Sequence, residues 1–152
     1  MSYSTVKEVR DMVKDDALNA LIGDRFIEDQ EERENFIAPI ISQSIDDADG
    51  EIDGYLAKRY PVPLGSTPKI INKFSKDIAV YNLFSRIGID EDSEQKNYLN
   101  RYQAAIKFLT LLAEGKVSIG AEGSDETATA ARTGFVVKSS PRIFSRESMR
   151  GM

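Results

Sequence analysis

The chain contains no cysteine and no histidine among its 152 residues. Without cysteine it can form neither a disulfide nor a thiolate metal site. Without histidine it lacks the commonest general base, the usual activator of a nucleophile and the usual ligand of transition metals. Any catalysis would have to rely on carboxylates, lysine or tyrosine. We therefore expect a protein that is not an enzyme and that carries no cofactor and no metal.

Long hydrophobic runs are absent as well. No apolar stretch approaches the roughly 18 residues that a membrane-spanning helix needs. The first residues, MSYSTVKEVRD, contain no apolar segment of the signal-peptide type. Because 41% of the residues are hydrophobic, a chain of this length can bury an ordinary core. We expect one soluble domain in the cytoplasm, without a membrane partner.

A basic balance is missing too, since the net charge is −5. A protein that coats nucleic acid should carry the opposite sign. The charge is unevenly divided: residues 132–152 hold five basic groups and one acidic group, whereas the preceding 131 residues hold 15 basic and 24 acidic groups. An acidic body thus ends in a basic tail. We expect body and tail to meet different surfaces, or the tail of one copy to meet the body of another.

Residues 46–56, DDADGEIDGYL, resemble a calcium-binding loop at first sight. If Gly50 is the glycine at the sixth position of an EF-hand loop, Ile45 is first and Leu56 twelfth, and neither side chain can bind calcium. Apolar residues instead continue through the segment at helical spacing, namely Ile37, Ile41, Ile45, Ala48, Ile52 and Leu56. Gly50 and Gly54 weaken a helix, so we expect close approach of another backbone there, with a hinge as the alternative.

Start and stop signals predict two short helices near the N-terminus. Thr5 and Glu8 have the spacing of a capping box ahead of a helix that begins at about Val6. A second helix of one or two turns would start at a cap formed by Asp15 or Asp16 and end at Gly23.

Three longer helices should follow. The charged segment 28–36 is expected to be a solvated connection or an exposed helical turn, with a metal site of clustered acids as a remote alternative. Asn35 would cap a helix over residues 36–59 that has Pro39 in its first turn. Pro61 and Pro63 end it, and Thr67 with Pro68 would start a helix that runs to about residue 87. The last helix would end near residue 113, before Gly115.

Each of the last two predicted helices has an apolar stripe of five residues. The stripe consists of Ile71, Phe74, Ile78, Tyr81 and Phe84 in the helix that follows Pro68, and of Leu99, Tyr102, Ile106, Leu109 and Ala113 in the last helix. Aromatic side chains on these stripes could hold a cofactor, but core packing explains them better.

After residue 116 the composition changes. The segment AEGSDETATAAR is small and polar, as is typical of a flexible linker. Beyond it, FVVK has the β-branched character of a strand, and PRIFSRESM mixes apolar residues with arginine. The expected fold is mainly α: a small helical bundle with one long central helix at 1–116, a flexible linker at 117–134, and an extended or strand-forming C-terminal docking arm at 135–152. Folding of the arm back onto its own helices is the alternative.

Several short motifs occur in a characteristic order. The central one runs from Ile45 to Leu64 as I-x-x-A-D-x-x-I-D-G-Y-L-x-x-R-Y-P-V-P-L. It is followed by Pro68, by D-I-A-x-Y-x-L at 77–83, by Arg101 and Tyr102, by L-A-x-G at 112–115, and by R-x-F-x-R at 142–146. This succession, over residues from about 3 to 150, resembles the family of Mu-like phage head-to-tail joining proteins. The linker around residues 121–133 is not part of the pattern.

The resemblance implies a structural protein of the virion neck, assembled in the host cytoplasm. It implies a ring of about a dozen copies, made by one repeated heterologous contact, that joins the portal protein to a downstream neck or tail-completion protein while DNA passes through the lumen. The partner-binding residues, for the portal or a neighbouring subunit, would be Phe135, Val136, Val137, Arg142, Ile143, Phe144, Arg146 and Met149. The residues expected to shape the body are Asp53, Tyr55, Arg59, Tyr60, Pro61, Asp77, Arg101 and Tyr102.

Within the body, Arg59 and Arg101 are expected to pair with Asp53 or Asp77, or else to face a neighbouring subunit, because charged groups on partly buried helix faces need partners.

Two other classes of protein stay open. A carboxylate-dependent hydrolase could use two of the acids Asp46, Asp49 and Asp53, which stand about one turn apart on one helix. A DNA-binding regulator would need a basic recognition helix, and none of the predicted long helices is basic.

Overall fold

The computed structural model describes residues 2–23, 27, 29–89 and 95–120. This part of the chain is mainly helical and contains no strand. Its helices are α1 (Val6–Arg10), α2 (Asp15–Ile22), α3 (Gln30–Leu56), α4 (Lys69–Ser85) and α5 (Lys96–Ala113). None of them is both long and apolar enough to cross a membrane.

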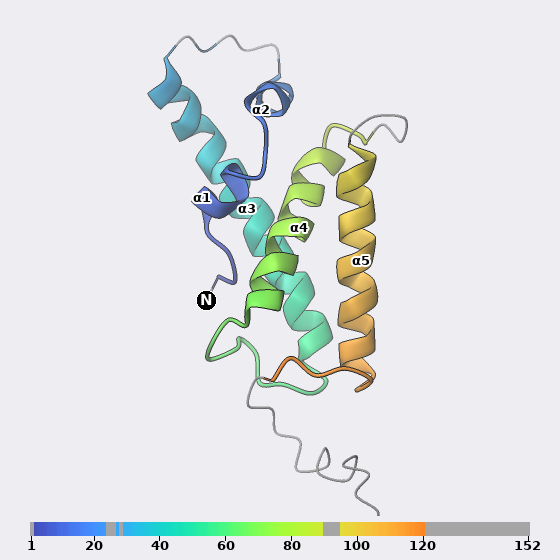
Figure 1. Ribbon diagram of the computed structural model, residues 1–152. Coiled ribbons are helices and arrows are strands. Elements are labelled where there is room, and N and C mark those ends of the chain that lie inside the picture. Colours follow the sequence, from blue (N-terminus) through green and yellow to red (C-terminus); the bar gives the residue numbers. More distant parts are fainter. Residues whose placement is uncertain (1, 24–26, 28, 90–94, 121–152) are drawn as a thin grey trace, which may run out of the picture.

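Helix α3 is the axis of the molecule (Figure 1). Its 27 residues correspond to a length of about 40 Å. Helices α4 and α5 pack against its second half, α1 contacts both α3 and α4, and α2 lies against its first half (Figure 1). The predicted bundle with one long central helix is therefore present. The predicted arm lies outside the described residues.

The apolar stripe predicted for α3 is buried over its whole length. Each of its six members is at most 2% exposed. Residues 46–56, which resemble a calcium-binding loop in sequence, are thus part of a helix, and their aliphatic side chains belong to the main core. In α4 the predicted stripe is buried apart from Tyr81, which is half-buried.

The start of α3 differs from the prediction. The helix begins at Gln30, with the Asp29 side chain accepting a hydrogen bond from the backbone N–H of Glu31, so Asn35 is not its cap. Pro39 lies inside the helix rather than in its first turn. The acidic segment lacks an apolar stripe, but glutamate, glutamine and arginine are good helix formers, and propensity extends the helix here. The helix also ends earlier, at Leu56.

Helix α1 follows its predicted signals, but the cap predicted for α2 is wrong, because Lys14, and neither Asp15 nor Asp16, takes the N-cap position and makes no side-chain cap hydrogen bond. Thr5 and Glu8 form the predicted capping box at α1. Helix α2 starts at Asp15, after Lys14 in the N-cap position, and stops at Gly23, whose φ of 74° is a left-handed conformation. Helix α4 starts one residue later than predicted, with Pro68 rather than Thr67 in the N-cap position.

Aromatic side chains join α4 to α5. Phe74 and Phe108 have ring centroids 5.1 Å apart, and two stacked pairs, Tyr81–Tyr102 and Phe84–Tyr98, lie at 4.0 and 4.7 Å. These rings pack against one another, as the core-packing interpretation predicts. The buried line of α5 consists of Ala105, Leu109 and Leu112, so the predicted stripe of this helix was only partly right. The aromatic residues Tyr98, Tyr102 and Phe108 at its edge are half-buried and pack against the core.

The close approach predicted at the two α3 glycines does not come from the described part of this chain. A Cβ atom built on Gly50 or Gly54 would meet nothing within 4 Å, and both residues are exposed. No backbone of the described chain therefore approaches them closely. The helix also continues through both positions without a break.

Candidate functional site

Two carboxylates of the central motif hold the N-terminal segment on the bundle. Asp49 is 8% exposed. Its Oδ2 accepts hydrogen bonds from the Tyr3 backbone N–H and from Ser2 Oγ, both at 2.9 Å. Its Oδ1 accepts a hydrogen bond from Ser75 Oγ at 2.7 Å. One side chain on α3 thus ties the N-terminus to α4.

Tyr3 forms the second part of the same network. Its ring is 2% exposed, its hydroxyl donates to Asp53, and the same hydroxyl accepts a hydrogen bond from the Leu64 backbone N–H at 3.1 Å. Burial and the hydrogen bond to Asp53 raise the pKa of Tyr3 to about 12. Ser4 adds a hydroxyl contact of 2.8 Å to Ser75. The N-terminal segment, the motif helix and the connector after it are therefore joined at one point, which we call the N-terminal clamp (Ser2, Tyr3, Ser4, Asp49, Asp53, Leu64 and Ser75).

A buried ion pair connects α4 and α5. The Asp77 side chain is fully buried, and it lies 2.5 Å from the Arg101 guanidinium and 2.9 Å from Lys73 Nζ. Of the two partners that the sequence offered Arg101, the structure selects Asp77. The Arg101 and Lys73 side chains are both partly exposed to solvent, and their charged ends reach the buried Asp77 carboxylate and neutralise it. The ion pair thus joins α4 to α5 beside the aromatic ring pairs that connect the same two helices.

Arg59 lies elsewhere, beside the chain after α5. Gly115 has a φ of 78°, and a Cβ on it would lie 2.3 Å from the Arg59 guanidinium. The positive φ favours glycine, whereas the nearby atoms belong to the flexible end of the Arg59 side chain, which can move aside. Next to this contact, Tyr60 is 7% exposed and its hydroxyl lies 3.5 Å from Ser118 Oγ. Val117 and Ile119 also pack against the core. The chain thus leaves the bundle beside the end of α3.

Tyr55 and Leu56, which were expected to pack, contact the core. Leu56 is buried and Tyr55 is half-buried against the core. The Tyr102 hydroxyl donates to Glu51 at 3.0 Å. Burial and this hydrogen bond raise the pKa of Tyr102 to about 12. Pro61, at the exit from α3, is exposed.

The three acids of the hydrolase hypothesis do not converge. Asp46 is exposed, whereas Asp49 and Asp53 are engaged in the N-terminal clamp. A catalytic pair would need two carboxylates that face one substrate. None of the three lines the surface groove between α3 and the end of α4.

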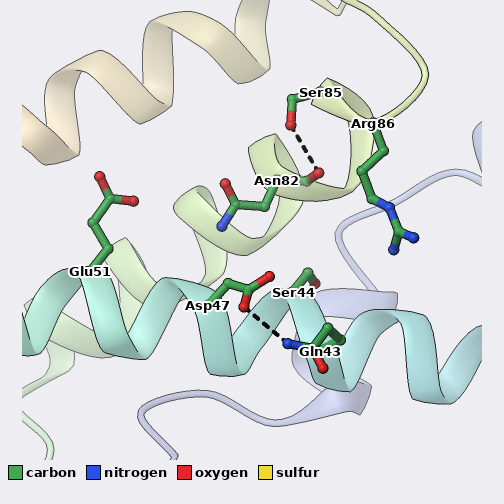
Figure 2. A pocket seen from close by; sticks show the side chains of 7 residues that line it. All are labelled: Gln43, Ser44, Asp47, Glu51, Asn82, Ser85 and Arg86. Carbon is green, nitrogen blue, oxygen red and sulfur yellow. Dashed lines mark hydrogen bonds between the residues drawn. The ribbon is translucent and has the colours of Figure 1, made fainter.

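A surface groove of about 550 Å³ lies between the middle of α3 and the last turns of α4 (Figure 2). Its lining is polar: Gln43, Ser44, Asp47, Glu51, Asn82, Ser85 and Arg86. Asp47 accepts a hydrogen bond from the Gln43 side-chain amide at 3.0 Å, and Ser85 donates to the Asn82 carbonyl oxygen at 3.0 Å. Arg86 is exposed at one end of the groove. With Asp47, Glu51 and Arg86 in its lining, the groove has a net negative charge.

The sequence of this chain was also compared with those of known proteins. A family model described as "Bacteriophage Mu, Gp36" matches residues 3–138. The chain belongs to this Mu-like phage family. Among its relatives, the Mu-like prophage FluMu protein gp36 of Haemophilus influenzae is 28% identical over 111 residues, which cover 73% of this chain and 74% of the relative. Gene product J of Escherichia phage Mu is 26% identical over 108 residues, which cover 71% and 72%.

The family match can be related to the geometry. The stretch matched by the Gp36 family begins at Tyr3, so it includes most of the N-terminal clamp, all five helices and the FVV segment of the arm. The eight residues predicted to bind a partner, from Phe135 to Met149, lie outside the described residues. Their role stays a prediction.

Sequence reasoning missed two features of this surface. It did not find Ser2 and Tyr3 as partners of the motif acids, because those contacts join residues more than 45 positions apart. It also did not single out Asp47 and Glu51. Their spacing of four residues on a helix face was visible in the sequence, and so was the lack of a lysine or arginine one turn away from either.

Proposed function

We propose that this member of the Gp36 family is a structural protein of phage assembly, a head-to-tail adaptor subunit. It forms a ring of about a dozen copies below the portal, by one repeated heterologous contact, and joins the portal to a downstream neck or tail-completion protein. The C-terminal arm, residues 135–152, docks on the portal or on the neighbouring subunit.

The observation that carries this proposal is the use made of the motif carboxylates. Asp49, Asp53 and Asp77 all bind donors of their own chain, at the N-terminal clamp and at the Arg101 pair. The motif therefore serves to build a rigid helical body. Family membership supports a phage role, and the adhesive, oppositely charged tail supports attachment to another molecule.

The acidic body suits a ring through which DNA moves. Residues 1–131 carry nine more acidic than basic groups. A lumen lined by such a surface repels phosphates and limits sticking of DNA during passage. DNA is then a passing cargo and not a ligand.

Deletion of residues 135–152 tests the docking role. The truncated chain and the full chain are each used to pull down the portal protein of the same phage. We expect the deletion to abolish capture while the helical content of the body, measured by circular dichroism, stays unchanged. Unchanged capture would refute docking of the arm on the portal.

A matched variant separates specific docking from simple charge attraction. Lys138, Arg142 and Arg146 are replaced together by glutamine, which leaves the apolar residues Phe135 to Val137, Ile143 and Phe144 in place. Loss of capture by both variants assigns the binding to the charges. Loss only on deletion assigns it to the apolar residues.

A further inference from the structure

The groove in Figure 2 contains two carboxylates that the bundle leaves without a cation. Asp47 and Glu51 stand one turn apart on α3, a spacing at which like charges repel each other. Their hydrogen bonds come from neutral donors, the Gln43 amide and the Tyr102 hydroxyl. Within the described part of the chain, neither forms an ion pair with a lysine or arginine, although Arg86 borders the same groove. The groove therefore has room and unsatisfied charge for a cationic ligand.

The same helix carries a strip of bare backbone beside these carboxylates. Positions 47, 50, 51 and 54 share one side of α3, because they follow each other at steps of three, one and three. Gly50 and Gly54 are exposed and have open space around them. Glycine weakens an exposed helix, and no contact within the described chain compensates for it. A bare strip does allow the backbone of another chain to come close.

The chain itself supplies a ligand of matching chemistry. Its last 21 residues carry five basic groups and one acidic group, and Arg142, Arg146 and Arg150 recur every four residues. Asp47 and Glu51 have the same spacing. Guanidinium groups form two parallel hydrogen bonds to a carboxylate, which favours arginine over lysine in such pairs.

We propose that the groove formed by α3 and the end of α4 binds the C-terminal arm of a neighbouring copy, with Arg142 and Arg146 at Asp47 and Glu51. This inference rests on the proposed function, in which the arm is a docking element, and it names the surface that receives it. Groove and arm are different surfaces of one chain, so the contact is heterologous and repeats from copy to copy, as a ring requires.

The chain's exit and the groove lie at opposite ends of α4. The described chain ends at Gly120, after Ser118 contacts Tyr60 beside the start of α4. The groove lies at the last turn of α4. Helix α4 has 17 residues, a length of about 25 Å, so the arm leaves from the opposite end of the helix. In Figure 1 the orange end of the described chain lies at the bottom of the bundle and the end of α4 at the top. The 22 residues from Gly120 to Arg142 can span up to about 70 Å, so reach allows the same copy or a neighbouring one, and we choose the neighbour because a ring requires a contact that repeats from copy to copy.

Disulfide crosslinking tests the contact without background, because the chain has no cysteine. One preparation of the full chain carries Ser85→Cys in the groove, and a second carries Ser145→Cys in the arm. After mixing and mild oxidation, we expect a crosslinked heterodimer to form at least about tenfold faster than with Gln103→Cys, an exposed position on α5 that serves as the control.

Charge reversal then tests the named pairs. Asp47→Arg with Glu51→Arg in the groove chain should reduce the rate to that of the control, and Arg142→Glu with Arg146→Glu in the arm chain should restore it. Equal rates at Ser85→Cys and Gln103→Cys, or reversal without effect, would overturn the proposal. So would faster closure within a chain that carries both cysteines than between chains, since it would assign the arm to its own groove.

This outcome is independent of the portal experiment. If crosslinking fails but deletion of residues 135–152 still abolishes portal capture, the arm binds the portal, and only the groove assignment falls. If both fail, the docking role of the arm falls as well.

Discussion

Replacement of Asp49 by alanine tests whether the N-terminal clamp stabilises the fold. The substitution removes the acceptor of three hydrogen bonds, from Ser2, the Tyr3 backbone and Ser75. A buried donor that loses its acceptor costs about 1–3 kcal/mol. Ser2 can turn to water, and Ser75 keeps its contact with Ser4, so the Tyr3 N–H is the main loss. With the packing of the released segment added, we expect the free energy of unfolding to fall by about 3 kcal/mol.

The measurement is urea unfolding followed by circular dichroism. Asp46→Ala is the control. Asp46 is exposed and lies one turn before Asp49, so its substitution removes the same charge and should change the free energy of unfolding by about 0.5 kcal/mol or less. Asp49→Asn should cost only about 1 kcal/mol, since its amide oxygen can accept from Tyr3 and its NH₂ can donate to Ser75. Equal stabilities of the Asp49→Ala and Asp46→Ala chains would show that the clamp contributes nothing, and the argument for a structural motif would fail.

Three further predictions concern other parts of the body. Arg101→Met should lower the free energy of unfolding by about 2–3 kcal/mol, because it leaves the buried Asp77 carboxylate poorly neutralised, and adding Asp77→Asn should recover part of that loss in the same urea titration. Since the folded-state pKa of Tyr3 is raised from 10 to about 12, the unfolded chain loses this proton first, so stability should fall as pH rises from 10 to 12. Tyr3→Phe should show a smaller fall; an identical pH profile would contradict the assignment. Gly50→Ala and Gly54→Ala should each raise the free energy of unfolding of the isolated chain by about 0.5–1 kcal/mol, because the added methyl groups meet open space, and a thermal melt that shows destabilisation would mean that something covers them.

Local patterns in the sequence predicted much of the bundle. The α3 stripe from Ile37 to Leu56 was identified because burial of one helix face imposes a period of 3.6 residues on the apolar positions. The capping box at Thr5 and the stop at Gly23 depend on neighbouring residues only, so they could be predicted in the same way.

The differences from the predictions have two physical causes. The first six residues of α3 have no buried face, so their helical state depends on propensity and on the Asp29 cap, which a search for apolar periodicity does not detect. The second concerns Gly50 and Gly54: the expected close approach does not come from the described chain, because glycine on a helix indicates that room is needed but not which molecule uses it. The packing of the other helices leaves the side of α3 that carries both glycines uncovered, and the sequence of α3 alone does not contain this information.

The candidate site was harder to predict than the fold. The partners of Asp49 and Asp53 come from the first residues of the chain, and a contact across such a separation leaves no periodic signal in a single sequence. The choice of Asp77 by Arg101 required the relative rotation of α4 and α5, which the packing of their aromatic rings determines. Physical expectation could name the possible pairs but could not select among them.

Four carboxylates in the second half of α3 form two sets with different consequences. Asp49 and Asp53 point toward the N-terminal segment and α4, where donors of the same chain satisfy them. Asp47 and Glu51 face the groove, where the described chain supplies neutral donors and no cation. Substitution of the first set should therefore lower the free energy of unfolding by several kcal/mol. Substitution of the second should cost at most about 1 kcal/mol, for the hydrogen bond between Tyr102 and Glu51, and should act mainly on association between copies. One helix would then carry the folding of the subunit on one side and its assembly on the other. A chain with both outer carboxylates reversed that loses no more than about 1 kcal/mol of unfolding free energy but no longer crosslinks would separate these two roles.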